Sequence, residues 1–277
     1  MSDVVSAIRD EVNEALSKDE LELPTLPEVA LRIRETAEQE DVSIKDLADV
    51  IGEDPGLSAQ VIRIANSPLY RGVSEVGTVQ MAISRLGMDF TRNLTTGLAM
   101  QQMFQATNDV IDRKLRSVWN HATQVAAISS ALARNCTRLK PDLATLAGLT
   151  HNIGVLPVLT WAEEHGRLHD SISLDAVVEK LQGQLGTLIL TKWEFPAELL
   201  CVPEEHNKYD RQRDKADYAD VVMVANLQSY VGTNHPNTEL DWHAISAFQR
   251  LGLDPDVSLT EVDELAADLE AAESLFN

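Results

Sequence analysis

Residues 143–162, LATLAGLTHNIGVLPVLTWA, form the longest stretch of this chain without a formal charge. The stretch has the length of a membrane span, but it contains His151, Asn152, Gly154 and Pro157. Burying a polar side chain without a hydrogen-bond partner costs about 1–3 kcal/mol. We therefore expect two buried helices that meet at Gly154, with His151 and Asn152 paired inside a protein core, and no membrane span.

Helical patterns recur along the chain, whereas convincing strand patterns do not. The chain has only 4 Trp, 4 Tyr and 5 Phe, so its core must consist mainly of aliphatic side chains. Apolar periodicity, capping residues and helix-stopping Gly and Pro predict helices over 27–39, 43–51, 54–66, 78–86, 89–105, 109–138, 141–150, 155–165, 174–193, 196–206, 216–231, 241–251 and 259–275. The fold class is therefore predicted to be all-α, as a two-lobed helical bundle.

The net charge of −21 is unevenly distributed. Residues 1–55 carry 5 basic and 16 acidic side chains, residues 56–150 carry 10 and 5, and residues 151–277 carry 8 and 23. This balance argues against affinity for nucleic acid or an anionic membrane, and solubility alone explains it as well as a specific role does. The acidic, amphipathic N-terminus is unlike a signal peptide, and the two cysteines form no CxxC motif. We expect a cytoplasmic protein.

Residues 43–65 have the outline of a helix-turn-helix. The second helix offers Gln60, Arg63 and Asn66, side-chain types that read bases and phosphates. Glu53 and the neighbouring acids oppose that function, so we do not expect specific DNA binding. Such binding would show as a strongly salt-dependent affinity for duplex DNA.

Sequence motifs of common active sites are absent. The chain has no GxxxxGKS or GxxxxGKT phosphate loop, no GxGxxG turn after a strand and no GxSxG nucleophile elbow. His121, His151 and His206 lie on separate predicted helices. From spacing alone they could converge on a metal ion, or each could be a buried histidine that bonds to the backbone or to an amide.

Several longer motifs together resemble the HDOD family of bacterial signalling domains. They are LPTLPEVALRIRE, SIKDLADVIGEDPGLSAQVIRIANSPLY, VQMAISRLG, VWNHATQVAAISSALA, LAGLTHNIGVLPVL, LGTLILTKWEFP and ADVVMVANLQSYV, within residues 23–232. The resemblance implies a relative of the HD metal-dependent phosphohydrolases that has lost catalysis. It divides the chain into an N-terminal helix (1–22), an N-terminal helical lobe (23–107), an HD-like lobe (108–232) and an acidic helical extension (233–277).

The resemblance also implies where an HD metal site would lie. His121 and His151 keep their histidines, but Asn152 and Asn226 stand where aspartates are expected, and Gln182 stands where a histidine is expected. Two adjacent histidines fall on Glu205 and His206. Amides carry no charge to balance a metal ion, so Glu205 alone could hold a cation, and weakly. We expect no catalytic residue, no metal and no cofactor, and a buried hydrogen-bond network at these positions.

A second set of family-characteristic positions lies at a helix junction in the first lobe. Asp54 is expected to cap a helix, Pro55 to occupy its first turn and Leu57 to enter the core. Asn66 and Ser67 are expected to end that helix and hold the following loop. The alternative is that this junction contacts the other lobe or a partner.

Two functions from different classes follow from the resemblance. The first is a non-enzymatic regulatory or scaffold protein of bacterial signal transduction, which acts through contacts with an unidentified protein partner in an oligomeric state that we do not predict. The alternative is a residual metal-dependent phosphohydrolase or nucleotide-binding protein that uses the remnant site. In that alternative Arg113, Lys114 or Arg116 would lie near a phosphate.

Overall fold

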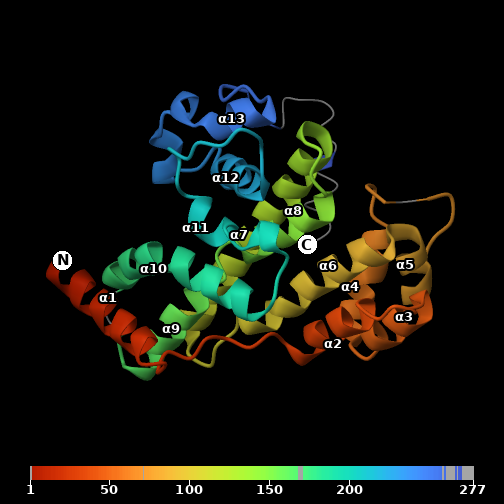
Figure 1. Ribbon diagram of the computed structural model, residues 1–277, viewed down its shortest axis with the longest axis horizontal. Coiled ribbons are helices and arrows are strands. Elements are labelled where there is room, and N and C mark those ends of the chain that lie inside the picture. Colours follow the sequence, from red (N-terminus) through yellow and green to blue (C-terminus); the bar gives the residue numbers. More distant parts are fainter. Residues whose placement is uncertain are drawn as a thin grey trace.

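The structure is a computed structural model that describes residues 2–70, 72–167, 171–257, 259, 266, 268 and 269, with the side chains of residues 2–4 and 171–173 left out. The described residues form α-helices, short 3-10 helices and loops, and none of them lies in a β-strand. The helices gather into two groups, joined along α6 (Met88–Ala99), as Figure 1 shows. The predicted all-α, two-lobed bundle is confirmed.

The first lobe packs short amphipathic helices around an aliphatic core. Ile33, Leu47, Ile51 and Ile64 are fully buried in it. A capping box from Ser43 to Asp46 starts α3, as the sequence predicts. The helices of this lobe besides α6 are α2 (Glu28–Ala37), α3 (Ile44–Gly52), α4 (Pro55–Ala65) and α5 (Val79–Leu86).

The second lobe is built on the long helix α7 (Asp109–Cys136). It contains α8 (Pro141–Thr150), α9 (Val155–Glu164), α10 (Ser171–Lys192), α11 (Val202–Glu205), α12 (Tyr218–Gln228) and α13 (Ser246–Leu251). The N-terminal helix α1 (Ser2–Ser17) lies at the far left of Figure 1, against α10. Val5, Ile8 and Val12 are buried in the core of the second lobe. The helix α1 is therefore packed as part of that lobe.

The two hydrophobic cores divide near the end of α6. Leu94 and Leu98 belong to the core of the first lobe, whereas Met100 belongs to the core of the second. The helix α6 packs on α2 and also on α8 of the other lobe, and residues 93–100 are all buried. The lobes therefore share an extensive contact along this helix.

The uncharged stretch forms the centre of the second lobe. The segment Pro141–Glu164 is long and apolar enough to cross a membrane, but an apolar stretch of 18 residues within it is 94% buried inside the protein. Helices α8 and α9 are separated by a turn at 151–154, so the expected pair of buried helices meeting at Gly154 is confirmed. A Cβ atom at Gly154 would lie 1.9 Å from the backbone oxygen of Gln182. The start of α9 therefore touches the backbone of α10.

Several predicted helices are shorter or broken. The helix expected over 89–105 changes to a 3-10 helix at Met100–Met103. The one expected over 196–206 splits into a 3-10 helix at Ala197–Leu199 and α11, which begins next to Pro203. The one expected over 241–251 splits into a 3-10 helix at Trp242–Ala244 and α13. The helix expected over 259–275 lies outside the described residues, apart from 259, 266, 268 and 269.

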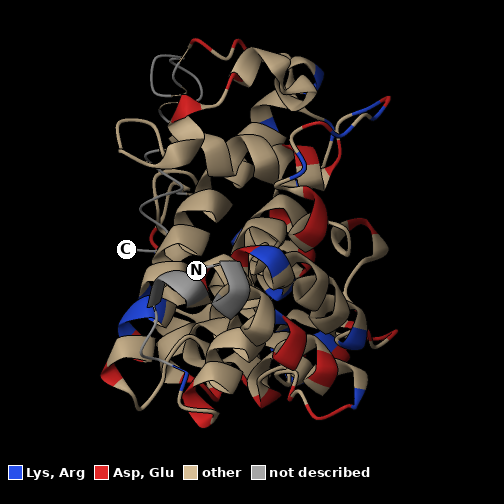
Figure 2. Ribbon diagram, turned by 90° about the vertical axis from the view of Figure 1, so that its left-hand side faces the viewer, with Lys and Arg blue, Asp and Glu red and all other residues tan. Residues whose placement is uncertain are grey.

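The acidic side chains are spread over many helices and loops. Figure 2 shows Asp and Glu at the top, side and bottom of the molecule, with Lys and Arg between them. Part of the charge is paired within the described chain, as in the Arg32–Glu53 and Arg116–Asp112 ion pairs.

Candidate functional site

A cavity of about 850 Å³ lies in the second lobe. It is bordered by α7, α9, α10 and α12, by the turn at 151–154, by the loop at 206–209 and by residues 235–237 at the start of a 3-10 helix (Pro236–Glu239). Its lining contains every predicted remnant position except Glu205: His121, His151, Asn152, Gln182, His206 and Asn226. These six side chains thus come together from three helices and two turns.

Two of the cavity histidines have a defined tautomer. The Nδ1 atom of His151 lies 2.6 Å from the carbonyl oxygen of Gly148, and that of His206 lies 2.9 Å from the carbonyl oxygen of Val202. A carbonyl oxygen can accept a hydrogen bond but cannot donate one, so Nδ1 carries the proton and donates in both rings. Burial lowers the pKa of His151 well below its usual value and that of His206 to about 4. Both rings are therefore neutral at pH 7, and each Nε2 is an acceptor.

His121 belongs to a polar and aromatic group at one side of the cavity. Its Nε2 lies 2.8 Å from Oδ1 of Asn226 and 3.2 Å from the hydroxyl of Tyr230. The ring of Tyr230 stacks with the ring of His121 and with that of His235, the centroids of Tyr230 and His235 being 3.6 Å apart. Burial lowers the pKa of His121, which keeps this group uncharged.

Asn152 has one satisfied and one unsatisfied polar atom. Its Nδ2 donates to the carbonyl oxygen of Val118 over 3.3 Å. Its Oδ1 is buried and has no hydrogen-bond partner among the described residues. We call His151, Asn152 and His206 the floor of the cavity; each of the three is at most 6% exposed.

The mouth of the cavity carries charge. We define it by Lys114, Asp175 and Glu179, which also line the cavity. Lys114 is paired with Asp175, and burial lowers the pKa of Lys114. Of the three basic residues expected near a phosphate, Lys114 alone is in the lining, since Arg116 pairs with Asp112 on its own helix and Arg113 is exposed.

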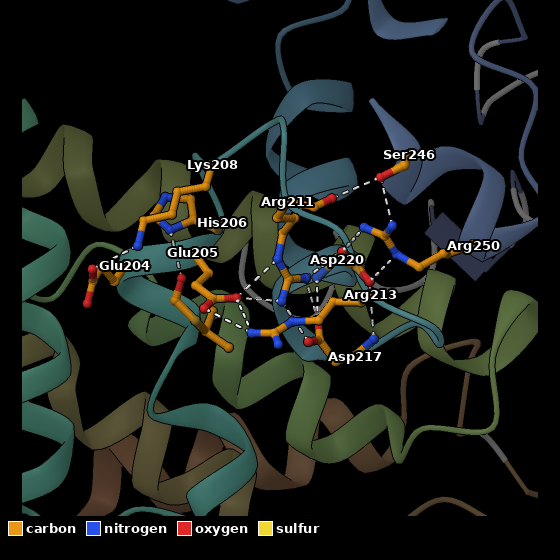
Figure 3. Close-up of polar contacts among 11 residues, drawn as sticks. Glu204, Glu205, His206, Lys208, Arg211, Arg213, Asp217, Asp220, Ser246 and Arg250 are labelled. Atoms are coloured by element: carbon orange, nitrogen blue, oxygen red, sulfur yellow. Dashed lines mark hydrogen bonds and ion pairs between the residues drawn. The ribbon is translucent and has the colours of Figure 1, made fainter. Parts of the chain in front are cut away.

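Glu205 points away from the cavity into an ionic network. Its carboxylate accepts from Arg211 over 2.6 Å and from Arg213 over 3.1 Å (Figure 3). Burial alone would raise the pKa of Glu205, but the two guanidinium groups lower it by more. Glu205, which was expected to hold a cation weakly, is therefore outside the cavity lining, and its charge is balanced by arginine.

Arg211 is the centre of this network. Its side chain is 5% exposed and also binds Asp217 and the fully buried Asp220. Arg250 from α13 donates to both oxygens of Asp220 over 2.7 Å (Figure 3). The network joins α11, α12 and α13 to the loop after α11, whose residues 206, 207 and 209 line the cavity. It therefore fixes one wall of the cavity.

A comparison with known proteins identifies the family to which the chain belongs. A family model for the HDOD domain matches residues 23–209. The chain belongs to the HDOD family. The match ends before residue 232, where the sequence motifs are expected to end, so α12 with Asn226 lies outside the matched HDOD region.

Solved relatives share the HDOD fold and its HD-like second lobe. The chain is 30% identical to a protein from Shewanella amazonensis SB2B whose name proposes a metal-dependent phosphohydrolase, with a TM-score of 0.88 and full coverage of both chains. It is 26% identical to a protein from Marinobacter aquaeolei VT8 whose name proposes a role in signal transduction. That match covers 99% of this chain and 66% of the other, with a TM-score of 0.64.

A curated relative gives no function. It is an uncharacterized protein from Treponema pallidum (strain Nichols), 23% identical over 220 residues and 74% of this chain. The chain spans only 42% of the length of that relative.

The cavity does not fit the metal site of an HD phosphohydrolase. Among the described residues, no group of three His, Cys, Asp or Glu side chains is placed to hold a metal ion. The lining has amides at 152, 182 and 226, and the nearby carboxylate of Glu205 is held by arginine. A divalent ion that activates water needs anionic or well-placed imidazole ligands, so these side chains are poorly matched to it.

The HDOD-characteristic junction lies in the first lobe, on elements other than those of the cavity. The carboxylate of Asp54 accepts from the backbone N–H of Leu57, and Pro55 occupies the first turn of α4. The side chain of Leu57 is buried in the core of the first lobe. Asn66 forms two hydrogen bonds of 2.8 Å with the backbone of Val76. These contacts are the structural roles that the sequence suggests for the four residues.

Ser67 differs from its neighbour Asn66. The hydroxyl of Ser67 is buried and has no hydrogen-bond partner among the described residues. We expect Asn66→Ala to lower the free energy of unfolding by about 2 kcal/mol, since the two hydrogen bonds to Val76 and a longer one from Arg85 are lost. Ser67→Ala removes an unsatisfied group, so we expect a change within about 0.5 kcal/mol. Urea unfolding of both variants measures the difference, and a larger loss for Ser67→Ala would contradict this assignment.

The neutral floor histidines predict acid sensitivity. Because their pKa values are lower in the folded chain, protons bind the unfolded chain better, and stability falls as the pH drops below about 6.5. We expect a loss of more than about 2 kcal/mol from His206 alone between pH 7 and pH 4.5. His206→Leu should flatten this dependence in urea unfolding. An unchanged slope would show that His206 is not buried as a neutral ring.

Sequence reasoning missed several lining residues. Tyr230 lies four positions after Asn226, so it follows Asn226 by about one helical turn, and this spacing was a usable signal. His235 caps a short 3-10 helix, Pro236–Glu239, that contains Asn237, and one such turn is too short for periodicity to indicate direction. Arg211 was also missed, because a polar loop gives no sign that one of its arginines is buried.

Proposed function

We propose that the chain is a non-enzymatic regulatory or scaffold protein of bacterial signal transduction that acts through contacts with a protein partner. The observation that carries the proposal is the pairing of Glu205 with two arginines. Glu205 directly precedes the cavity histidine His206, and its carboxylate binds Arg211 and Arg213. The floor of the cavity therefore contains uncharged side chains. An HD-like lobe in this state keeps its packing without the ligands that metal-dependent hydrolysis requires.

Two further observations support a regulatory role. Lys114, the basic residue of the lining expected near a phosphate, is engaged by Asp175. The similar protein from Marinobacter aquaeolei VT8 has a name that proposes signal transduction. The name of the Shewanella protein supports the alternative, a metal-dependent phosphohydrolase.

Metal content and hydrolysis test the proposal together. The purified chain is incubated with Mn²⁺, Fe²⁺ or Zn²⁺, desalted and measured for bound metal, and its activity is assayed on bis-p-nitrophenyl phosphate. We expect substoichiometric metal and no hydrolysis above the buffer blank. A stoichiometric metal ion, with hydrolysis that a chelator abolishes, would overturn the proposal.

A variant with restored ligands provides a positive control. Asn152→Asp, Gln182→His and Asn226→Asp together return the expected HD residues to the lining. We expect this triple variant to retain more metal than the parent chain in the same assay. Equal metal retention by both would show that the amides are not what separates this chain from a metal-binding HD site.

A further inference from the structure

We propose that the cavity binds a small organic diamine, with one ammonium group on the floor and the other at the mouth. The proposal rests on the proposed function in one respect, because it requires a floor without a metal ion.

The floor contains three hydrogen-bond acceptor atoms that have no donor partner among the described residues. Nδ1 donates to a backbone carbonyl in both His151 and His206, which leaves Nε2 of each neutral ring as an acceptor. Oδ1 of Asn152 is a third acceptor, buried and without a partner among the described residues. A primary ammonium group carries three N–H donors and no acceptor. It is therefore complementary in number and kind to the free atoms of the floor.

The surrounding charges favour a cation over an anion. Glu179 lines the mouth and forms no ion pair with the described residues, whereas Lys114 is already paired with Asp175. The net charge of −21 raises the local concentration of cations. A phosphate group would meet free acceptor atoms on the floor and an unpaired carboxylate at the mouth. Both contacts are repulsive for an anion.

The shape and composition of the lining fit a diamine. A cavity of about 850 Å³ is in the range of small-molecule sites. The floor lies among buried side chains, where hydrogen bonds to a charged donor are strong. Tyr209 adds an aromatic ring to the wall, and aromatic rings attract organic cations.

Calorimetric titration of the full chain tests the proposal. The probes are 1,4-diaminobutane, butylamine, inorganic phosphate and Mn²⁺, each at pH 7.5. We expect saturable one-to-one binding of 1,4-diaminobutane, weaker binding of butylamine, and none of phosphate or Mn²⁺. Asn152→Leu should weaken both amines by about tenfold or more, since a charge-assisted hydrogen bond is lost.

Variants at the mouth separate the two ends of the diamine. Glu179→Gln should weaken 1,4-diaminobutane by about threefold and leave butylamine unchanged, because an exposed ion pair contributes little. Glu164→Gln, an exposed change at the end of α9 outside the lining, is the matched control and should change neither. Circular dichroism establishes that each variant is folded. If Asn152→Leu is not, His206→Leu removes another acceptor and should weaken both amines similarly.

Three results would overturn the inference. Without saturable diamine binding and without Mn²⁺ binding, the inference fails and the proposed function stands. If Mn²⁺ binds and displaces the diamine, both fail. If the diamine binds equally to the parent chain, Asn152→Leu and Glu179→Gln, it is held elsewhere on the acidic surface, and the cavity assignment is wrong.

Discussion

Replacing Arg211 with Met should lower the free energy of unfolding by about 3–5 kcal/mol, the usual cost of breaking a buried ion pair on one side. Arg211 is 5% exposed on its side chain, and it binds Asp217 and the fully buried Asp220. Burial alone would lower the pKa of Arg211, but the surrounding carboxylates raise it. Removing the guanidinium leaves Asp217 without its ion-pair partner and the fully buried Asp220 with Arg250 alone. Urea unfolding followed by circular dichroism measures the loss.

Arg213 provides a matched control for this variant. It binds the same carboxylate of Glu205, but its side chain is 49% exposed. We expect Arg213→Met to cost about 1 kcal/mol or less, as is usual for exposed ion pairs. Equal losses for the two variants would show that the burial of Arg211 contributes nothing. Since the network supports residues 206–209, Arg211→Met should also disturb the cavity wall.

Gly154→Ala is the second large effect that we expect. The added Cβ would lie 1.9 Å from the backbone oxygen of Gln182 and 2.6 Å from the backbone nitrogen of Gly186. Neither backbone atom can rotate away, so α9 and α10 must separate. We expect a loss of about 3 kcal/mol or more in the free energy of unfolding, at the upper end of overpacking costs. Thermal and urea unfolding both measure it.

Gly52→Ala is the control for the change at Gly154. No atom lies within 4 Å of a Cβ built at Gly52, and the residue ends α3 in a helical conformation. Alanine loses less backbone entropy on folding than glycine, so we expect stabilisation by about 0.5 kcal/mol. A loss at Gly154 no larger than the change at Gly52 would mean that α9 and α10 are not in backbone contact.

Much of the fold could be predicted from local sequence patterns. Ser43, Asp54 and Pro55 mark helix starts whose hydrogen bonds form within a few residues, so their effect does not depend on distant parts of the chain. The predicted helices over 141–150 and 155–165 agree closely with α8 and α9. Errors occurred at 196–206 and 241–251, where the helical pattern was right but the chain changes direction between two short segments.

The candidate site was predicted in part. The HDOD resemblance named six side chains that line one cavity, because related folds place equivalent residues in the same position. It could not show that Glu205 turns away, since that depends on Arg211 and Arg213, which lie in a loop. Nor could it show which nitrogen of His151 and His206 carries the proton, because the backbone carbonyls of Gly148 and Val202 decide this.

The HDOD resemblance implied that amides stand where HD relatives carry metal ligands. The sequence by itself determined that this chain is all-α and that 143–162 is buried as two helices. These properties follow from residue type and periodicity, which are local. The tertiary structure decided that the amides and histidines surround one cavity, that Asn152 keeps an unpaired acceptor in its floor, and that arginine neutralises Glu205. Each of these depends on which groups from distant segments come into contact, and a linear pattern does not contain that information.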